Sequence, residues 1–458
     1  MRNLLLISFL FLSTHIFGQD NFKVPAFEKY KLKNGITVYL MEQHEIPLVN
    51  VNMVFNAGSI HDGTQFGLSS TTADGLLLGT SKYTKSDIEE KTDFLGAQLN
   101  TYSSKDKAGL AATFAKKDQA VLFDIIQQVV MHPNFENSEY EKSKKRNILQ
   151  LTQQKESPRA VISNYFDSFV YSDFPYAHPT NGTPQTIEKI TREQLIEFYQ
   201  TNYTTEQAAI AIVGDFKIGD MKKTVAQLFD NWKTKPARMI KRKAPEMDFD
   251  QSRVLLVNKE DATETTFLIG GKGIPYNSED YVSIMVANTI LGDRFTSWLN
   301  DALRVNSGLT YGAGSRFIRN QFAGTFYIST FTKNQTTVQA IDMALNVLDS
   351  LHQTGPNEQI LASAKAYVKG DFPPNYESAS SLALLLTDMH IYKFDENFIN
   401  LFQKKVEQID LPQIKAVIKK YFPQNKLQFV VIGKTEEIED QLTKYGTITK
   451  KEIKSDGF

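Results

Sequence analysis

A weak internal repeat constrains this chain more than any other feature. Residues 187–214 resemble residues 406–433, and four positions match at a single offset of 219 residues. The matched pairs are Ile190/Ile409, Leu195/Ile414, Tyr203/Phe422 and Gly214/Gly433. Each copy predicts an amphipathic helix opened by an N-cap residue type, Thr191 or Asp410, and then an apolar strand. We infer a duplication, and therefore two homologous halves of roughly 200 residues each, an ordinary domain size.

The boundary between the halves is expected in residues 233–250. This segment holds Pro236, Pro245 and six basic residues between positions 233 and 243, without a sustained apolar period. Such a pattern favours a solvated linker over a binding site for an anionic ligand. We therefore expect an N-terminal domain over 20–232, a C-terminal domain over 251–445 and a polar tail over 446–458.

Strands and helices alternate irregularly within the first half. The turn residues Lys33, Asn34 and Gly35 predict a hairpin between strands at 27–32 and 37–41. Further strands are expected at 49–55, 99–103 and 108–114, and helices at 67–78, 85–95, 119–131 and 139–154. This order predicts an α+β fold rather than a doubly wound parallel sheet.

Charge and cysteine content exclude several functions. The chain has 51 Lys and Arg against 52 Asp and Glu, which gives no field to attract nucleic acid. Cysteine is absent, which excludes disulfides, thiolate catalysis, Cys-ligated zinc and iron–sulfur clusters. The seven histidines carry most of the remaining capacity to bind a metal.

The first residues predict a secretory signal peptide over 1–19. Arg2 supplies the positive region, residues 4–12 the apolar region, and residues 14–19 a polar-to-small exit. An uncleaved membrane anchor is less favoured because the apolar run is short for a membrane span. The mature chain is expected to be soluble in an exported compartment, most simply a bacterial periplasm, with no stable membrane insertion.

Several stretches resemble one family of enzymes. Residues 31–84 read KLKNGITVYLMEQHEIPLVNVNMVFNAGSIHDGTQFGLSSTTADGLLLGTSKYT, and residues 303–312 read LRVNSGLTYG. Shorter matches lie at 94–100, 132–135 and 174–183. Together they resemble the insulinase/pitrilysin-type zinc peptidases, and in particular the processing-peptidase branch, whose subunits have two such halves. The resemblance implies two halves, each a mostly antiparallel sheet packed with helices, that face each other around a chamber.

The zinc motif of that family is altered in this chain. By the resemblance, active members carry H-x-x-E-H in the helix after Gly67-Leu68, with a further Glu one helix later. The first His, the base, the second His and the distal Glu are replaced by Ser70, Ala73, Asp74 and Leu151. The neighbours Leu149 and Gln150 would be no better as ligands. Because catalytic zinc needs about three protein ligands, we expect no zinc and no hydrolysis by this chain alone.

Other histidines do not rebuild the site. His44, His61 and His178 form no His-x-x-x-His pair and are expected to be structural or surface residues. Asp74 is expected on a helix surface or in a polar network.

Two elements of a peptide site remain. The family motif R-x-x-x-G-L-x-Y is kept from Arg304 to Tyr311, and the resemblance implies that both side chains reach toward bound peptide. The bland alternative is a surface Arg and a packed Tyr. Asn100, Thr101 and Tyr102 lie where the family places an edge strand, which can bind an extended peptide through its main chain.

These observations leave three hypotheses open. The first is a non-catalytic subunit of a heteromeric peptidase, whose related partner supplies H-x-x-E-H and zinc and whose substrate is a peptide or unfolded polypeptide. The second is a non-enzymatic peptide-binding or assembly scaffold of the same fold. The third and least favoured is an active peptidase with an unorthodox site.

Overall fold

The structure is a computed structural model that describes residues 22–237 and 242–458. The expected signal peptide at 1–19 lies outside these residues. No described helix has both the length and the apolar content that a membrane crossing requires.

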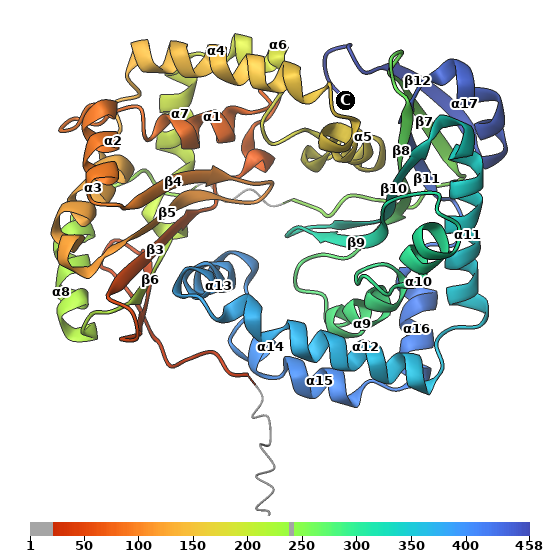
Figure 1. Cartoon of the computed structure of the whole chain (residues 1–458). Coiled ribbons are helices and arrows are strands. Elements are labelled where there is room, and N and C mark those ends of the chain that lie inside the picture. Colours follow the sequence, from red (N-terminus) through yellow and green to blue (C-terminus); the bar gives the residue numbers. More distant parts are fainter. Residues whose placement is uncertain (1–21, 238–241) are drawn as a thin grey trace, which may run out of the picture.

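The N-terminal half is built on a six-stranded sheet in the order β1-β2-β6-β3-β5-β4 (Figure 1). Its strands are β1 Glu28–Lys31, β2 Thr37–Glu42, β3 Leu48–Phe55, β4 Gln98–Ser103, β5 Ala108–Ala115 and β6 Ala209–Gly214. Only β2 and β6 pair in parallel. β1 and β2 form the expected antiparallel hairpin, and Gly35 supplies the positive φ of its turn.

The C-terminal half repeats this plan in a sheet of order β12-β7-β11-β8-β10-β9. Its strands are β7 Arg253–Asn258, β8 Glu264–Lys272, β9 Ala313–Arg319, β10 Gly324–Lys333, β11 Gln428–Gly433 and β12 Thr447–Glu452. β7 pairs in parallel with β11 and β12, and the other pairs are antiparallel. The prediction of two mostly antiparallel α+β halves is therefore confirmed.

The repeated segment forms the same unit in both halves. α7 Arg192–Asn202 leads to β6, and α16 Leu411–Tyr421 leads to β11. Thr191 and Asp410 each close a capping box, which satisfies N–H groups of the first helical turn. Both strands are completely buried, which explains why their apolar runs were the most visible part of the repeat.

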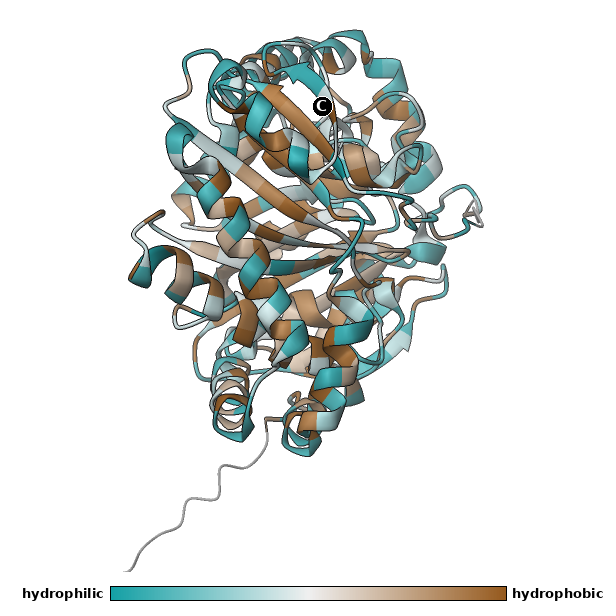
Figure 2. Cartoon of the chain, turned by 90° about the vertical axis from the view of Figure 1, so that its right-hand side faces the viewer, coloured by the Kyte–Doolittle hydropathy of each residue, from teal (hydrophilic) through white to brown (hydrophobic). Residues whose placement is uncertain are grey.

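Most remaining helices cover the outer faces of the two sheets (Figure 1). In the first half they are α1 Leu68–Gly75, α2 Lys85–Phe94, α3 Gln119–Met131, α4 Asn137–Gln154, α6 Pro184–Lys189 and α8 Ile218–Phe229. In the second half they are α9 Tyr281–Leu291, α10 Trp298–Asn300, α11 Thr337–Gln353, α12 Glu358–Asp371, α14 Asn397–Asn400, α15 Phe402–Gln408 and α17 Thr435–Leu442. Figure 2 shows apolar residues on the inner strands and hydrophilic residues on the outward helix faces.

The two halves exchange one helix each. α5 Pro158–Tyr171 belongs to the first half but packs on β8 and β11, and α13 Ala379–Tyr392 belongs to the second half but packs on β3 and β6 (Figure 1). Leu386 of α13, for example, is buried in one cluster with Ala209 of β6. Each buried side chain of this size contributes about 1.5–3 kcal/mol. The exchange therefore holds the halves in a fixed relation.

Residues 446–458, expected from sequence as a polar tail, are part of the folded structure. Residues 447–452 form the edge strand β12, and residues beyond it pack on the first half. The Phe458 ring lies 5.1 Å from that of Tyr165, and Lys155 Nζ donates to the carbonyl of Gly457 at 3.0 Å. The sequence looked like a tail because an edge strand exposes most side chains while its backbone pairs.

The segment expected as a linker carries no helix or strand over 233–237 and 242–250. Met247 is nevertheless buried, and Arg242 Nη2 donates to the carbonyl of Ile60 at 2.8 Å.

Candidate functional site

α1 carries the positions that the family resemblance assigns to the zinc helix. Its N-cap, Gly67, has φ +93°, a conformation that few other residues adopt. The Asp62 carboxylate accepts N–H groups of Gly67 at 2.9 Å and Ser69 at 2.8 Å, and thereby caps the helix. Burial raises the pKa of Asp62 to about 8, against the lowering effect of these N–H donors. The helix ends at Gly75, earlier than the 67–78 expected from sequence.

The side chains at the three zinc-motif positions on α1 lie in different environments. Ser70 Oγ donates to Asn181 Oδ1 at 3.1 Å, so its hydroxyl is already engaged. Ala73 is fully buried in the apolar core. Asp74 reaches solvent, but the protein around it desolvates the carboxylate and raises its pKa to about 6. A single carboxyl is the only strong metal ligand of this set.

The distal position is apolar as well. Leu151, on α4, is buried in the same cluster as Ala73. Its neighbours Leu149 and Gln150 are exposed, and neither offers a carboxylate. Over residues 22–237 and 242–458, no group of three His, Cys, Asp or Glu side chains is placed to hold a metal ion. The residues at the family's zinc positions therefore do not fit zinc.

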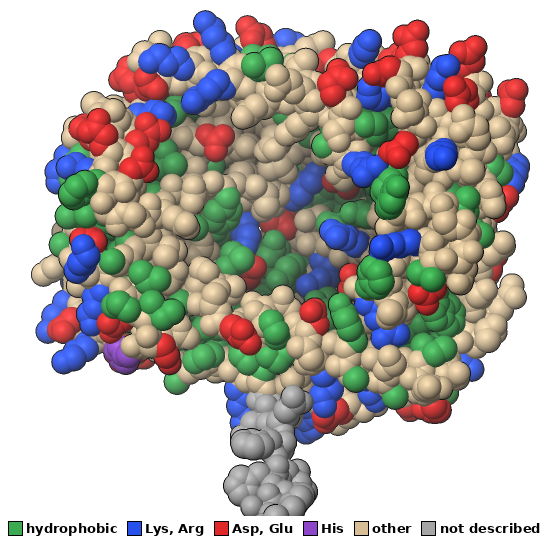
Figure 3. Space-filling model, viewed as in Figure 1, with side chains coloured by type: hydrophobic (Ala, Val, Ile, Leu, Met, Phe, Trp, Pro, Cys, Tyr) green, Lys and Arg blue, Asp and Glu red, His purple; other side chains and the backbone are tan. Residues whose placement is uncertain are grey.

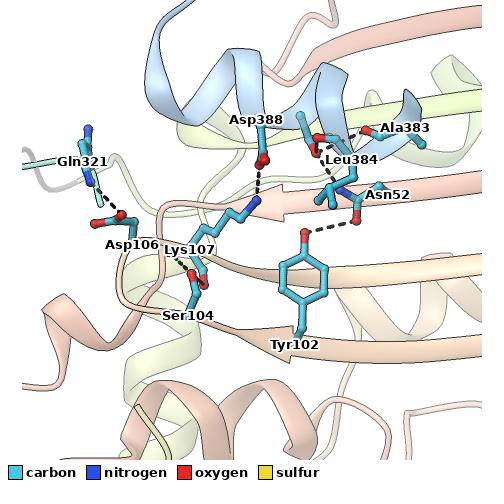
Figure 4. Close-up of polar contacts among 10 residues, drawn as sticks. Asn52, Tyr102, Ser104, Asp106, Lys107, Gln321, Ala383, Leu384 and Asp388 are labelled. Carbon is cyan, nitrogen blue, oxygen red and sulfur yellow. Dashed lines mark hydrogen bonds and ion pairs between the residues drawn. The ribbon is translucent and has the colours of Figure 1, made fainter. Parts of the chain in front are cut away.

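Asn100, Thr101 and Tyr102 lie on β4, at the free edge of the first sheet. Asn100 is exposed, whereas Tyr102 OH donates to Asn52 Oδ1 at 3.1 Å (Figure 4). Asn52 Nδ2 in turn donates to Thr387 of α13 at 2.5 Å. Burial raises the pKa of Tyr102 above its ordinary value. The Tyr102 side chain thus connects the edge strand to α13.

The R-x-x-x-G-L-x-Y motif folds into a tight turn. Arg304 sits in a short π-helix, Asp301–Asn306, with its Cζ 4.6 Å from the centre of the Phe295 ring. Gly308 has φ +64°, and Leu309 N donates to the carbonyl of Leu303 at 2.9 Å. Tyr311 follows with 83% of its surface exposed. The turn therefore fixes the backbone and leaves the Tyr311 side chain free to meet another molecule.

Arg304 lines a cavity of about 670 Å³ between α5, β9 and β10. Tyr311 is not part of its lining, although the next residue, Gly312, is. Figure 3 shows a central hollow with Lys and Arg side chains along its right-hand wall. The cavity also holds Arg159, Arg294 and Arg316. Sequence reasoning missed these three because they come from separate elements and form no motif.

The β4–β5 turn meets the second half close to the hollow. Lys107 forms an ion pair with Asp388 of α13 (Figure 4). Lys105 Nζ lies 3.2 Å from Asp167 of α5. Asp106 accepts the backbone N–H of Gln321 at 2.9 Å. Burial raises the pKa of all three carboxyl groups, Asp106, Asp167 and Asp388. This junction joins the two halves through polar contacts.

Comparisons with known proteins agree with this geometry. The family model described as "Insulinase (Peptidase family M16)" matches residues 37–184, and "Peptidase M16 inactive domain" matches residues 189–368. The second match begins within the first half, since it includes β6 of the first sheet, and it extends into the second half.

Among the curated relatives, some are described as zinc proteases and one as a non-peptidase homolog. The "Uncharacterized zinc protease YmxG" of Bacillus subtilis is 21% identical over 77% of this chain and 85% of its own length. The "Non-peptidase homolog YmxG" of Helicobacter pylori is 22% identical over 87% of this chain and 92% of its own length.

Solved structures share the fold over nearly the whole chain. A "peptidase M16 inactive domain" from Pseudomonas fluorescens has a TM-score of 0.84 at 24% identity and covers 90% of this chain and 98% of its own. A protease from Helicobacter pylori has a TM-score of 0.82 at 19% identity, with 90% and 100% covered. The chain belongs to the insulinase family of peptidases (M16), as a member that lacks the residues of the zinc motif.

Proposed function

We propose that this chain is the non-catalytic subunit of an exported heteromeric metallopeptidase. A related partner chain would supply H-x-x-E-H, zinc and the general base. This chain would hold the peptide and complete the partner's site with Arg304 and Tyr311. One observation carries the proposal: all four zinc-motif positions are replaced, yet R-x-x-x-G-L-x-Y keeps its full spacing and exposes Tyr311.

The chemistry of the two side chains suits that role. A Tyr hydroxyl donates a hydrogen bond to the oxyanion that develops during amide hydrolysis. An Arg guanidinium binds a peptide carbonyl or carboxylate. Within residues 22–237 and 242–458, no hydrogen bond engages the hydroxyl of Tyr311, so the group is available to a ligand. The packing of Arg304 on Phe295 orients the guanidinium before substrate arrives.

Peptide would be held first by the edge of β4. An edge strand offers unpaired main-chain N–H and C=O groups, which an extended peptide can pair with irrespective of its side chains. The exposed Asn100 marks the free part of this edge, while Tyr102 is engaged with Asn52. The proposal therefore assigns binding at Asn100–Tyr102 to the backbone rather than to the tyrosine hydroxyl.

Export is part of the proposal because of the charge and hydropathy of residues 1–19. The partner would then be an exported chain as well.

Reconstitution tests the proposal. The chain is mixed with an H-x-x-E-H relative from the same genome, and a fluorogenic peptide is offered to each chain and to the mixture. We expect a stable complex, with a hydrolysis rate far above that of either chain. A partner that is equally active alone, or that forms no complex, would contradict the proposal. An active mixture that loses all activity when the partner's Glu is replaced by Gln confirms where the base lies.

A further inference from the structure

The cavity that contains Arg304 has a counterpart in the other half of the molecule. We call the first the arginine cavity; it lies between α5 and strands β8, β10 and β9, and has a volume of about 670 Å³. The counterpart cavity lies between α13 and strands β3, β5 and β4, and has a volume of about 480 Å³. Each is formed by one sheet and by the helix exchanged from the other half.

Strand register establishes which residues are equivalent. Ile212 of β6 pairs with Val51, and Val431, 219 residues later, pairs with Phe267. Followed across the neighbouring strands, the same pairing aligns Tyr102 of β4 with Arg316 of β9, since they pair with Gly109 and Tyr327. The two exchanged helices align from their first residues, Pro158 and Ala379, which matches Arg159 with Ser380.

The equivalent positions differ in charge. The counterpart cavity is lined mostly by neutral residues: Asn50, Val51, Asn52, Tyr102, Ala111, Ala112, Thr113, Ser380, Ser381, Ala383 and Leu384. Its one cation, Lys107, is paired with Asp388. The arginine cavity has Arg159, Arg294, Arg304 and Arg316, and Asp293 is the only carboxylate among its described lining residues. The cavity of the second half is therefore cationic, and its counterpart in the first half is lined mostly by neutral residues.

Part of this positive charge is compensated: burial raises the pKa of Asp293, and the nearby charge of Arg316 lowers it. Arg159 lies 2.9 Å from Glu264. Among the residues that the structure describes, no carboxylate lies within 4.0 Å of the guanidinium nitrogens of Arg294, Arg304 or Arg316. Arg294 donates to Ser363 Oγ at 2.9 Å, while its Nε is buried without a hydrogen-bond partner. A buried donor without a partner is costly, so a ligand that supplied an acceptor there would be favoured.

Aromatic rings hold two of the guanidinium groups in place. Arg159 lies with its Cζ 3.3 Å from the centre of the Phe331 ring, and Arg304 stacks on Phe295. Such stacking orients the planar donor groups of arginine toward a carboxylate, although Nη2 of Arg159 already donates to Glu264 at 2.9 Å. The main chain of β9, an edge strand, forms another wall of the cavity through residues 313–316. An extended peptide along this wall would bring a side chain or its end to the arginines.

We propose that the arginine cavity binds a carboxylate of the peptide, supplied by an Asp or Glu side chain or by the peptide's C-terminus, and thereby selects acidic peptides. The inference rests on the proposed peptide-holding function and names its substrate class. The cavity volume is in the range of ligand sites, about 300–1,000 Å³. Four guanidinium groups against one lining carboxylate, Asp293, suit an anion and disfavour a cationic peptide.

Exchanging residues between the two cavities provides the variants. Arg159→Ser and Arg316→Tyr place at each position the residue of the counterpart cavity. Arg316→Gln removes the charge with a smaller change, should Arg316→Tyr lower the melting temperature. Lys223→Gln, an exposed charge on the outer helix α8, is the matched control. Arg304 is left unchanged, so that its role in the partner's site is not disturbed.

The probes are three fluorescent peptides of the same length and sequence. One has a central Glu and an amidated C-terminus, the second replaces Glu by Gln, and the third is the Gln peptide with a free C-terminal carboxylate. Binding to the full chain is measured by fluorescence anisotropy. A carboxylate held by arginine should improve Kd by about tenfold over the Gln amide peptide. Whether the Glu peptide or the free-acid peptide gains identifies the source of the carboxylate.

The outcomes separate the two proposals. We expect Arg159→Ser and Arg316→Tyr to abolish the improvement in Kd that the carboxylate brings, without changing the Kd of the Gln amide peptide. Lys223→Gln should change neither of these Kd values. If all three peptides bind equally to the unmodified chain, or the gain survives both variants, the arginine cavity does not select carboxylates, although peptide binding stands. If no peptide binds to the chain or to the reconstituted complex, the proposed function and this inference both fail.

Discussion

Lys107 in the β4–β5 turn pairs with Asp388 of the exchanged helix α13, and both side chains are largely buried, with 10% and 15% of their surfaces exposed. The pair lies where the first sheet meets a helix of the second half (Figure 4). It therefore joins the two halves at the edge of the hollow. Asp388 is equivalent to Asp167 of α5, which pairs with Lys105. The same acidic position is thus used on both exchanged helices.

Loss of one partner of this pair should destabilise the chain strongly. Lys107→Met removes the ion-pair partner of the buried Asp388 and leaves only the more distant charge of Arg319, and we expect a loss of about 3 kcal/mol in the free energy of unfolding. Urea denaturation measures it. The double variant Lys107→Met/Asp388→Leu should recover most of the loss. Lys142→Gln, which removes an exposed pair, should cost less than about 1 kcal/mol. Equal effects of the buried and exposed variants would contradict this account.

Asp74 provides a pH-dependent prediction at the former zinc helix. Its pKa is raised to about 6 in the folded chain, above the ordinary value of 3.8, so the charged form is disfavoured by folding. The resulting penalty is absent below the ordinary pKa, grows as pH rises and is complete above about pH 6. Asp74→Asn should therefore stabilise the chain at pH 7.5 by about 1 kcal/mol, a value reduced for solvent exposure.

The measurement is urea denaturation of both proteins at several pH values. The gain from Asp74→Asn should shrink as the pH falls from 6 toward 4. A substitution that destabilises at pH 7.5 would show that the carboxylate makes a favourable contact, as a metal ligand would.

Residues 446–458 should contribute to stability as part of the fold. Phe458→Ala removes the ring that packs on Tyr165. We expect a cost of about 1–2 kcal/mol, less than that of a fully buried Phe. Lys454→Ala, an exposed neighbour, is the control and should be nearly neutral. A melting temperature unchanged by Phe458→Ala would support the sequence-based interpretation of this segment as a tail.

Metal removal should have no effect on the isolated chain. Ala73 and Leu151 are buried apolar residues, and Ser70 is engaged with Asn181. We expect elemental analysis to find no stoichiometric zinc, and EDTA to leave the melting temperature unchanged. Stoichiometric zinc together with EDTA-sensitive cleavage by the pure chain would restore the hypothesis of an unorthodox active site.

Local patterns in the sequence predicted much of the fold. The duplication was predictable from the N-caps Thr191 and Asp410 and from the apolar strands that follow them. Both signals depend only on residues close together in the sequence. The exchange of α5 and α13 was not predictable in this way. An amphipathic helix shows which face it buries, but its sequence does not name the sheet that covers that face. Residues 447–452 were missed because the edge strand leaves most of its side chains exposed.

The candidate site was predicted only in part. The replaced zinc positions were predicted from their spacing relative to Gly67. Arg304 and Tyr311 were predicted from the spacing of R-x-x-x-G-L-x-Y. The arginine cavity could not, because Arg159 and Arg316 lie far apart in the sequence and meet only through the exchanged helix. Asp74 also showed a property that its position on a helix does not reveal, since its raised pKa depends on the surrounding protein.

The central claim is that this chain completes the active site of a partner. Its most direct test is the kcat of the reconstituted complex with Tyr311→Phe, which removes one hydroxyl from an exposed side chain. We predict a fall of about a hundredfold in kcat, with KM and complex assembly unchanged. A Tyr311→Phe complex that assembles and hydrolyses peptide at the full rate would contradict the claim.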